Sequence, residues 1–283
     1  MNFEFVETRT KQNIKLFGCL SQKSNNKRCI LYIPGLAGNF FESKFPREIA
    51  KESIEKGYDF LFSHNQGSFQ IIEFPFLKDD GKTKSIMKGA AYEKFEDSVF
   101  DIASWLDFLE KKKYKEIIVL CHSLGCNKIV YYLNQTKDNR ISKIILLAPQ
   151  DNVNFSELEM HKGLLEEAIK NINNNEPNKI LSKKFLGFCL ISSETYFQEI
   201  INKNINNIPY KTIDGDFSLM HAIDKPIYII TGSDDIGENG KEFMEKTINN
   251  CQTAKYDILV GANHNFKNKE PELIKLIFNY LDI

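Results

Sequence analysis

The chain lacks the cysteine spacings that indicate a zinc site or a disulfide framework. Its six cysteines, at positions 19, 29, 121, 126, 189 and 251, include no Cys-x-x-Cys pair, and they are interpreted as reduced, buried thiols. No apolar run approaches the length needed to span a bilayer, and residues 1–9 lack the apolar block of a signal peptide. These absences predict a cytoplasmic protein without a membrane span.

An excess of charge of one sign is also missing. The 37 Lys and Arg residues balance the 38 Asp and Glu residues, and the formal net charge is −1. Bulk attraction to nucleic acid is therefore not expected. The basic run 111–113 is explained by the end of a helix, where cations interact favourably with the helix dipole. The rest of the composition is that of an ordinary globular chain with one buried core.

Buried strands and amphipathic helices alternate along most of the chain. An opening antiparallel hairpin is predicted from residues 3–8 and 14–20, which alternate in the period of a strand. Further strands are predicted at 29–33, 58–62, 116–121, 142–147, 226–231 and 256–260. Helices are predicted at 46–56, 91–112, 123–134 and 273–281. This alternation favours an α/β fold with a mostly parallel sheet between layers of helices.

Residues 151–221 interrupt the alternation. They contain helical segments such as 164–172 and no clear buried strand. An insertion between two strands can lie over the carboxyl ends of the sheet, where ligands bind in open α/β proteins. We therefore predict a core domain of residues 1–150 and 222–283 with a helical cap, or lid, at 151–221. A plain helical crossover is the alternative interpretation of this segment.

The segment Cys121-His122-Ser123-Leu124-Gly125 carries the strongest indication of chemistry. It stands between an apolar strand and a helical pattern, and a serine flanked two positions away by small residues in that setting is typical of a nucleophile elbow. The turn is so sharp that bulky neighbours would collide with the backbone. Ser123 is therefore the candidate nucleophile, with Cys121 where Gly is usual. An ordinary strand-to-helix turn is the alternative.

A nucleophilic serine needs a base, and the base needs an orienting carboxylate. The strand at 226–231 is followed by Gly232-Ser233-Asp234-Asp235, and the strand at 256–260 is followed by Gly261-Ala262-Asn263-His264. Both motifs lie at the carboxyl ends of predicted strands, as Ser123 does. The order Ser, Asp, His along the chain is the order described for α/β-hydrolases.

On these motifs the chain resembles the α/β-hydrolase-fold proteins over nearly its whole length. The resemblance implies an α/β fold with a mostly parallel eight-stranded sheet flanked by helices and a helical cap insertion. It also implies a catalytic triad of Ser123, Asp235 and His264. Asp234 is the close alternative for the acid, and Asp151 is a more distant one, because some relatives place the acid after the preceding strand.

The same resemblance implies an oxyanion hole made of two backbone amides. One is the amide of Leu124, directly after the nucleophile. The other is the amide of Leu36, in the loop Pro34-Gly35-Leu36-Ala37-Gly38-Asn39. Pro34 replaces a histidine that is usual in this loop, but backbone donors need no particular side chain. Two such donors would lower a barrier by several kcal/mol, on the order of 2.7–4 for each.

Several side chains near these motifs allow either a purely structural or a functional interpretation. Phe40, His64 and His122 are candidates for the substrate pocket. His122 fills the variable position of the elbow, where a packed histidine is expected rather than a base. His161 and His221 flank or lie in the predicted cap and are interpreted as structural or exposed.

The resemblance implies a serine hydrolase that cleaves a carboxylic ester or thioester through an acyl-enzyme on Ser123, with no metal or organic cofactor. Its expected partner is a small-molecule acyl ester, and the oligomeric state is left open. An acyltransferase or peptidase on the same triad is one alternative, and a catalytically silent ligand-binding protein is another. Serine at the elbow argues against the dehalogenase type, which uses aspartate. The segment 35–42 is somewhat similar to that of short-acyl and feruloyl-type esterases.

Overall fold

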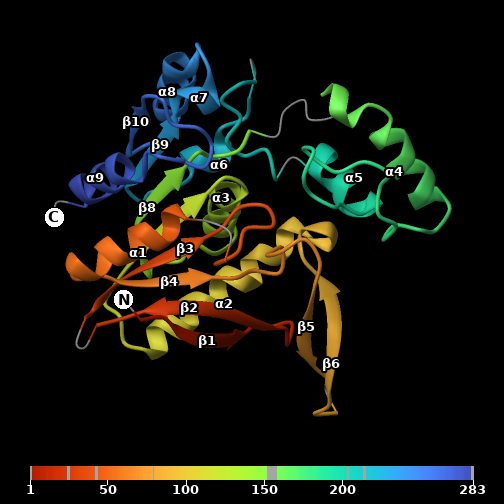
Figure 1. Ribbon diagram of the computed structural model, residues 1–283, viewed down its shortest axis with the longest axis horizontal. Coiled ribbons are helices and arrows are strands. Elements are labelled where there is room, and N and C mark those ends of the chain that lie inside the picture. The colour runs from red at the N-terminus through yellow and green to blue at the C-terminus, as the bar shows by residue number, and fades with distance from the viewer. Residues whose placement is uncertain are drawn as a thin grey trace.

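A sheet of eight strands is the centre of the computed structural model (Figure 1). The structure describes residues 2–23, 26–41, 44–78, 80–151, 158–202, 204–212 and 215–281. The strand order is β1-β2-β4-β3-β7-β8-β9-β10, with antiparallel pairs β1–β2 and β2–β4 and parallel pairs throughout the rest. The strands are β1 (Glu4–Arg9), β2 (Lys15–Ser21), β3 (Arg28–Ile33), β4 (Asp59–Ser63), β7 (Glu116–His122), β8 (Ile141–Leu147), β9 (Ile227–Gly232) and β10 (Ala254–Leu259). The predicted mostly parallel eight-stranded sheet is confirmed.

Helices cover both faces of this sheet because successive side chains of each strand point to opposite faces. One face packs against α2 (Ser98–Lys111), α3 (Leu124–Thr136) and α8 (Gly240–Asn249). The other packs against α1 (Phe45–Glu55) and α9 (Glu270–Tyr280). Within the described ranges, no helix combines the length and the hydropathy that a membrane-spanning helix requires.

The helix predicted at 91–112 is shorter than expected. A 3₁₀ turn (Ala90–Tyr92) and a second one (Phe95–Asp97) precede α2, which begins at Ser98. Between the two turns the backbone is extended at Glu93 and Lys94. The Glu93 carboxylate turns inward and pairs with Lys128 of α3, which is fully buried. A long-range ionic contact has therefore overridden the local helical pattern.

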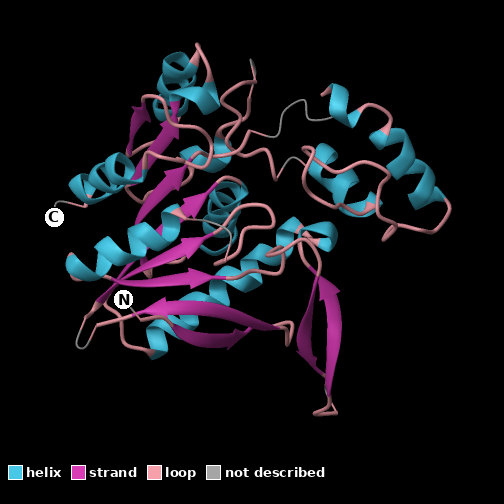
Figure 2. Ribbon diagram, viewed as in Figure 1, coloured by secondary structure: helices cyan, strands magenta, loops and turns pink. Residues whose placement is uncertain are grey.

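A second, two-stranded sheet was not predicted. Its strands are β5 (Ile72–Leu77) and β6 (Thr83–Lys88), which pair in antiparallel fashion and stand away from the main sheet (Figure 2). Pro75 interrupts the run of β5, and proline within a run argues against a strand unless it lies at an edge. Phe74 anchors the hairpin, since its side chain is fully buried and its ring stacks on Phe17.

The chain between β8 and β9 divides its contacts between two places. The helices α4 (Leu164–Asn173) and α5 (Ser193–Ile201) form a small apolar cluster of their own and lie to one side of the sheet (Figure 1). Farther along, Ile208, Tyr210 and Met220 pack into the main core, the last of them in α6 (Ser218–His221). The division into core and cap stays a prediction, and residues 152–157 of the predicted cap lie outside the described residues.

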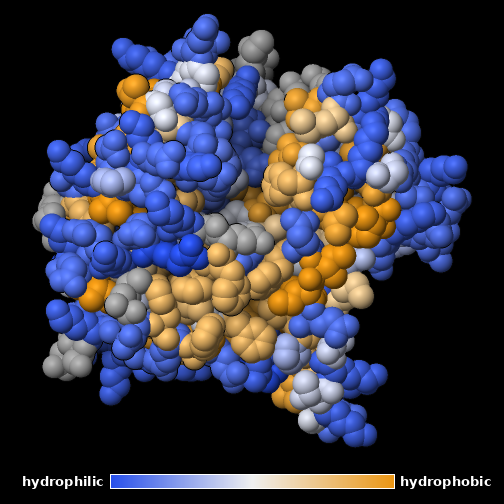
Figure 3. Space-filling view, in the orientation of Figure 1, coloured by the Kyte–Doolittle hydropathy of each residue, from blue (hydrophilic) through white to orange (hydrophobic). Residues whose placement is uncertain are grey.

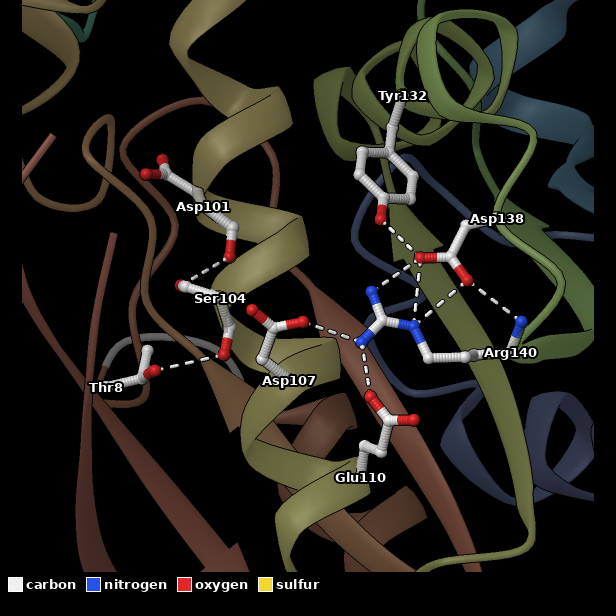
Figure 4. Close-up of polar contacts among 8 residues, drawn as sticks. All are labelled: Thr8, Asp101, Ser104, Asp107, Glu110, Tyr132, Asp138 and Arg140. Atoms are coloured by element: carbon white, nitrogen blue, oxygen red, sulfur yellow. Dashed lines mark hydrogen bonds and ion pairs between the residues drawn. The ribbon is translucent and has the colours of Figure 1, made fainter. Parts of the chain in front are cut away.

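A guanidinium clamps the outer ends of α2 and α3 together (Figure 4). Arg140, at the end of the loop before β8, donates to Asp107 at 2.7 Å and to Glu110 at 3.1 Å, both on α2. It also donates to both oxygens of Asp138. The same carboxylate accepts the Tyr132 hydroxyl of α3 at 2.6 Å. The bidentate pairing of Arg140 with Asp138 fixes the direction of the guanidinium. The network therefore fixes the ends of α2 and α3 relative to each other, on the face of the sheet that these two helices cover.

Two buried carboxyl groups, Glu199 on α5 and Asp101 on α2, have raised pKa values. Glu199 of α5 is 5% exposed, and burial together with the nearby Glu93 carboxylate raises its pKa to about 8, although Lys128 opposes the shift. Burial likewise raises the pKa of Asp101 on α2 to about 7, against the lowering effect of two hydrogen bonds from Gln66. Glu199 is therefore largely protonated in the folded protein at neutral pH.

The raised pKa of Glu199 predicts a pH-dependent stability. In the unfolded chain the carboxyl ionises near its ordinary value of 4.5, so the folded state holds one more proton between about pH 4.5 and pH 8. The stabilisation is complete below that window and is lost as the pH rises through it, by at most about 1.4 kcal/mol per pH unit. We expect Glu199→Gln, which cannot ionise, to gain stability relative to wild type across this window and to show a constant difference above it.

Urea unfolding from pH 4.5 to pH 9 measures the difference in free energy of unfolding between this variant and wild type. Glu194→Gln on the same helix is the matched control, because Glu194 is only half-buried and already bonded to Gln198. A difference between Glu199→Gln and wild type that does not change with pH would contradict the assignment.

Candidate active site

The turn between β7 and α3 holds Ser123 in a strained backbone conformation, with φ of 52° and ψ of −127°. The Ser123 amide donates to Leu147 of β8 at 3.0 Å, which ties the turn to the neighbouring strand. Gly125 packs against the end of β3, where an added Cβ would lie 2.5 Å from the Ile33 carbonyl oxygen. A side chain at that position would push the two elements apart, so the sharp turn depends on glycine there.

Cys121, at the position where such turns usually carry glycine, fits because its side chain points into the core. The residue is fully buried within the cluster of β3, β7 and α3. Burial, with the nearby Cys126, raises the pKa of its thiol well above the ordinary value, so it stays a neutral packing group. The departure from the usual motif leaves the turn intact.

The structure brings Ser123, His264 and Asp235 together from three separate loops. The Ser123 Oγ lies 2.9 Å from His264 Nε2, and His264 Nδ1 lies 2.9 Å from Asp235 Oδ2. In the tautomer that this geometry favours, Nδ1–H donates to the carboxylate and Nε2 accepts the serine proton. The three side chains therefore form one continuous path for a proton.

The alternative acids are engaged elsewhere. Asp234 Oδ1 accepts the Ser233 hydroxyl at 3.0 Å, and Asp151 Oδ2 accepts the backbone amide of Lys211 at 2.6 Å. Both Asp234 and Asp235 belong to the short helix α7 (Ser233–Ile236), and the direction of this turn decides which of them faces His264. Of the three carboxylates, that of Asp235 is the one that lies at hydrogen-bond distance from His264.

The two amides predicted to form an oxyanion hole, those of Leu36 and Leu124, belong to segments that adjoin Ser123. Gly35 approaches the nucleophile so closely that an added Cβ would lie 2.8 Å from Ser123 Cβ, which brings the following peptide, that of Leu36, beside the serine. The Leu124 amide opens α3. Within the described part of the chain, neither amide donates to a protein acceptor. Both are thus available donors of the kind that an oxyanion hole uses.

The predicted pocket residues divide into one that lines the pocket and two that support it. His122 lines the pocket and donates from Nε2 to the His264 carbonyl oxygen at 2.8 Å. Burial, with the nearby His264, lowers its pKa to about 3, so it is neutral. His64 is buried with a pKa lowered to about 4, and it accepts the Phe40 amide at 3.1 Å. Phe40 packs on Phe3 rather than facing the pocket.

The remaining histidines lie apart from Ser123. His161 is buried among Phe185 and Tyr196, where its Nε2 accepts the Leu186 amide at 3.0 Å. His221 is exposed at the end of α6. These positions agree with the structural or exposed interpretation of both residues.

A pocket of about 890 Å³ opens over Ser123. Leu36, Leu186 and Phe188 give it an apolar part, and Asn265, Lys267 and Asn268, in the loop after β10, give it a polar part. Figure 3 shows the surface hollowed between the body of the sheet and the α4–α5 segment, with hydrophobic side chains gathered along the α4–α5 side. This shape suits a substrate with one apolar and one polar half.

Gln150 is a site residue that the sequence did not reveal. Its side-chain Oε1 lies 3.3 Å from Ser123 Oγ, and the residue lines the pocket. The only available signal was its place shortly after β8, the strand next to the elbow strand. An uncharged residue at a strand end has no distinctive pattern, so the structure was needed to find it. Among the described residues, no three His, Cys, Asp or Glu side chains group as a metal site would require.

Comparison with protein families gives a match in the middle of the chain. A family model described as serine hydrolase matches residues 92–188, which include the elbow turn and α4. Two curated relatives, from Mycoplasma pneumoniae and Mycoplasma genitalium, both carry the name "Putative esterase/lipase 2". They are 24% and 26% identical over 62% of this chain. The alignments span 65% of the length of each relative.

Solved structures agree with this chain over its whole length. The α/β hydrolase GrgF from Penicillium sp. sh18 superposes with a TM-score of 0.70 and 16% identity, over 100% of this chain and 97% of the other. Est1E from Butyrivibrio proteoclasticus, in a complex with ferulic acid, superposes with a TM-score of 0.64 and 14% identity, over 98% of each chain. These likenesses show that the chain has the α/β-hydrolase fold, and within it residues 92–188 are similar to the serine hydrolase family.

Proposed function

We propose that this protein is an enzyme that hydrolyses a carboxylic ester or thioester through an acyl-enzyme on Ser123. The observation that carries the proposal is the continuous hydrogen-bonded path from Asp235 through His264 to Ser123 at the base of an open pocket. Such a path couples a nucleophile, a general base and an orienting carboxylate. The esterase/lipase names of the two Mycoplasma relatives support the same reaction class.

In the first half-reaction, His264 Nε2 takes the Ser123 proton while Oγ attacks the substrate carbonyl carbon. The amides of Leu36 and Leu124 stabilise the negative oxygen of the tetrahedral intermediate. His264 then gives its proton to the leaving alcohol or thiol, and the carbon–oxygen or carbon–sulfur bond breaks. Asp235 holds the imidazole in the correct tautomer and stabilises its charged form.

The substrate class follows from the two parts of the pocket. The apolar part at Leu36, Leu186 and Phe188 suits an acyl group, and Phe188 is 52% exposed, which leaves its ring available to a ligand. The polar part lies on the His264 loop, and His264 is the group that protonates the leaving group. The alcohol or thiol half therefore belongs there. Est1E binds ferulic acid, so an aromatic acyl group is worth including among the test substrates.

Two alternatives use the same residues. An acyltransferase or a peptidase would differ in the molecule that accepts or carries the acyl group, and the triad suits all of them equally. A catalytically silent binding protein would have no need for a base aligned at 2.9 Å on the serine hydroxyl and oriented by a carboxylate. We therefore favour an enzyme over a binding protein.

Hydrolysis of p-nitrophenyl esters tests the proposal directly. We expect the purified protein to release p-nitrophenol from acetate, butyrate and octanoate esters, and Ser123→Ala to lower kcat/KM by about 10⁴-fold or more, because the nucleophile is lost. Circular dichroism of both proteins checks that the variant folds. Equal hydrolysis by wild type and the folded variant would rule out an acyl-enzyme on Ser123.

A pair of adjacent substitutions tests the identity of the acid. We expect Asp235→Asn to lower kcat by about 10³- to 10⁴-fold, because the amide cannot hold the imidazole in the required tautomer. Asp234→Asn is the matched control, since Asp234 bonds Ser233 instead. We expect this variant to retain activity within about threefold, a change smaller than the loss of one hydrogen bond would cause. The reverse pattern in steady-state kinetics would assign the acid to Asp234.

A further inference from the structure

The Ser123 hydroxyl has two polar neighbours and only one hydrogen to donate. His264 Nε2 lies at 2.9 Å and Gln150 Oε1 at 3.3 Å. Because His264 Nδ1 donates to Asp235, its Nε2 is an acceptor, and the serine proton goes to it. Activation of the serine therefore does not require Gln150. The side-chain amide of Gln150 is available as a hydrogen-bond acceptor in another step of the reaction.

The position of Gln150 is held by buried hydrogen bonds on its backbone. Its carbonyl oxygen accepts Asn127 Nδ2 at 2.9 Å, and the carbonyl of the preceding Pro149 accepts the Tyr210 hydroxyl at 3.2 Å. Asn127 is fully buried on α3 and also donates to Ile205 at 2.9 Å. A loop anchored at two successive carbonyls fixes the backbone from which the Gln150 side chain extends toward Ser123 Oγ, as a positioning residue needs.

The step left for Gln150 is the attack of water on the acyl-enzyme, a reading that rests on the proposed function. Once the acyl group is attached, Oγ has no hydrogen, and the amide oxygen of Gln150 has no serine proton to compete for. The attacking water carries two hydrogens, and His264 Nε2 accepts one of them. We propose that Gln150 is a positioning residue whose Oε1 accepts the other hydrogen and so fixes the water for attack.

The deacylation step then balances as follows. The water oxygen bonds to the acyl carbon while its proton moves to His264 Nε2, and the amides of Leu36 and Leu124 hold the oxyanion. As the tetrahedral intermediate collapses, the bond from the acyl carbon to Ser123 Oγ breaks and Oγ takes the proton back from His264. The carboxylic acid leaves, and Gln150 exchanges no proton at any point.

This arrangement favours water over an alcohol as the acyl acceptor. An alcohol has a single hydroxyl hydrogen, which His264 takes, and its carbon chain stands where the second hydrogen of water would meet Gln150. The hydrogen bond to Gln150 is therefore available to water alone. A site with this hydrogen bond acts as a hydrolase rather than an acyltransferase. Loss of the hydrogen bond shifts the partition of the acyl-enzyme from hydrolysis toward transfer to the alcohol.

Product partitioning measures the effect. The wild type and Gln150→Met are incubated with p-nitrophenyl butyrate in buffer containing methanol, and butyrate and methyl butyrate are quantified by gas chromatography. Methionine matches glutamine in length but has no strong acceptor. We expect the ratio of butyrate to methyl butyrate to fall about tenfold, as for the loss of one hydrogen bond. The p-nitrophenol burst, which reports acylation, stays within about threefold.

Gln150→Glu is the conservative variant that separates positioning from packing. It keeps an oxygen acceptor at the same place, so we expect its partition ratio to stay within about twofold of wild type, even if the added charge slows both steps. It also covers the case in which Gln150→Met does not fold, because a partition ratio that falls in the glutamate variant would overturn the proposal. An unchanged ratio in a folded Gln150→Met would overturn it as well.

The outcome also separates this inference from the proposed function. Without a burst and without turnover in the wild type, the acyl-enzyme itself fails and the role of Gln150 falls with it. If the burst is normal and requires Ser123, but the partition ratio is the same in wild type and Gln150→Met, the proposed esterase activity is supported and only the role of Gln150 is refuted.

Discussion

Close packing between the end of β3 and the turn at Ser123 is the constraint on which the site depends. Both sides of this contact carry a glycine: a Cβ on Gly35, just after β3, would lie 2.8 Å from Ser123 Cβ, and a Cβ on Gly125, at the start of α3, would lie 2.5 Å from the Ile33 carbonyl oxygen. The packing holds the serine at a φ of 52°, a conformation that costs of order 1–3 kcal/mol. It also sets the Leu36 peptide beside the nucleophile. One contact between the loops that follow two neighbouring parallel strands thus positions both the proposed nucleophile and the proposed oxyanion donor.

The same sheet geometry explains how residues far apart in the chain share one site. The carboxyl ends of β7, β8, β9 and β10 lie along one edge, and these ends carry Ser123, Gln150, Asp235 and His264. Neutral His122 steadies the His264 backbone from beneath. The start of α5 is joined to this framework by hydrogen bonds, since the Ser192 amide donates to the Ala91 carbonyl at 2.9 Å and the Thr195 hydroxyl donates to the Glu93 carbonyl at 3.3 Å.

The sequence predicted the strands of the main sheet, though not β5 and β6, and candidate site residues at strand ends, because apolar runs and glycine-flanked turns are local signals. It did not distinguish Asp235 from Asp234, since one turn of α7 decides which faces His264. It also placed the start of α2 too early, because the buried pairing of Glu93 with Lys128 has no local pattern. Gln150 was missed for the same reason: its role depends on a neighbour 27 positions away.

The proposed function requires that Ser123, which this packing holds 2.9 Å from His264 Nε2, is a far stronger nucleophile than an ordinary serine. A fluorophosphonate probe tests it most directly, because the probe bonds only to a serine that a neighbouring base activates. Intact-mass and peptide mass spectrometry would compare wild type with His264→Gln. The account predicts one adduct per chain, located on Ser123 and lost when His264 is replaced. A folded wild type that takes up no probe, or an adduct on another residue, would contradict it.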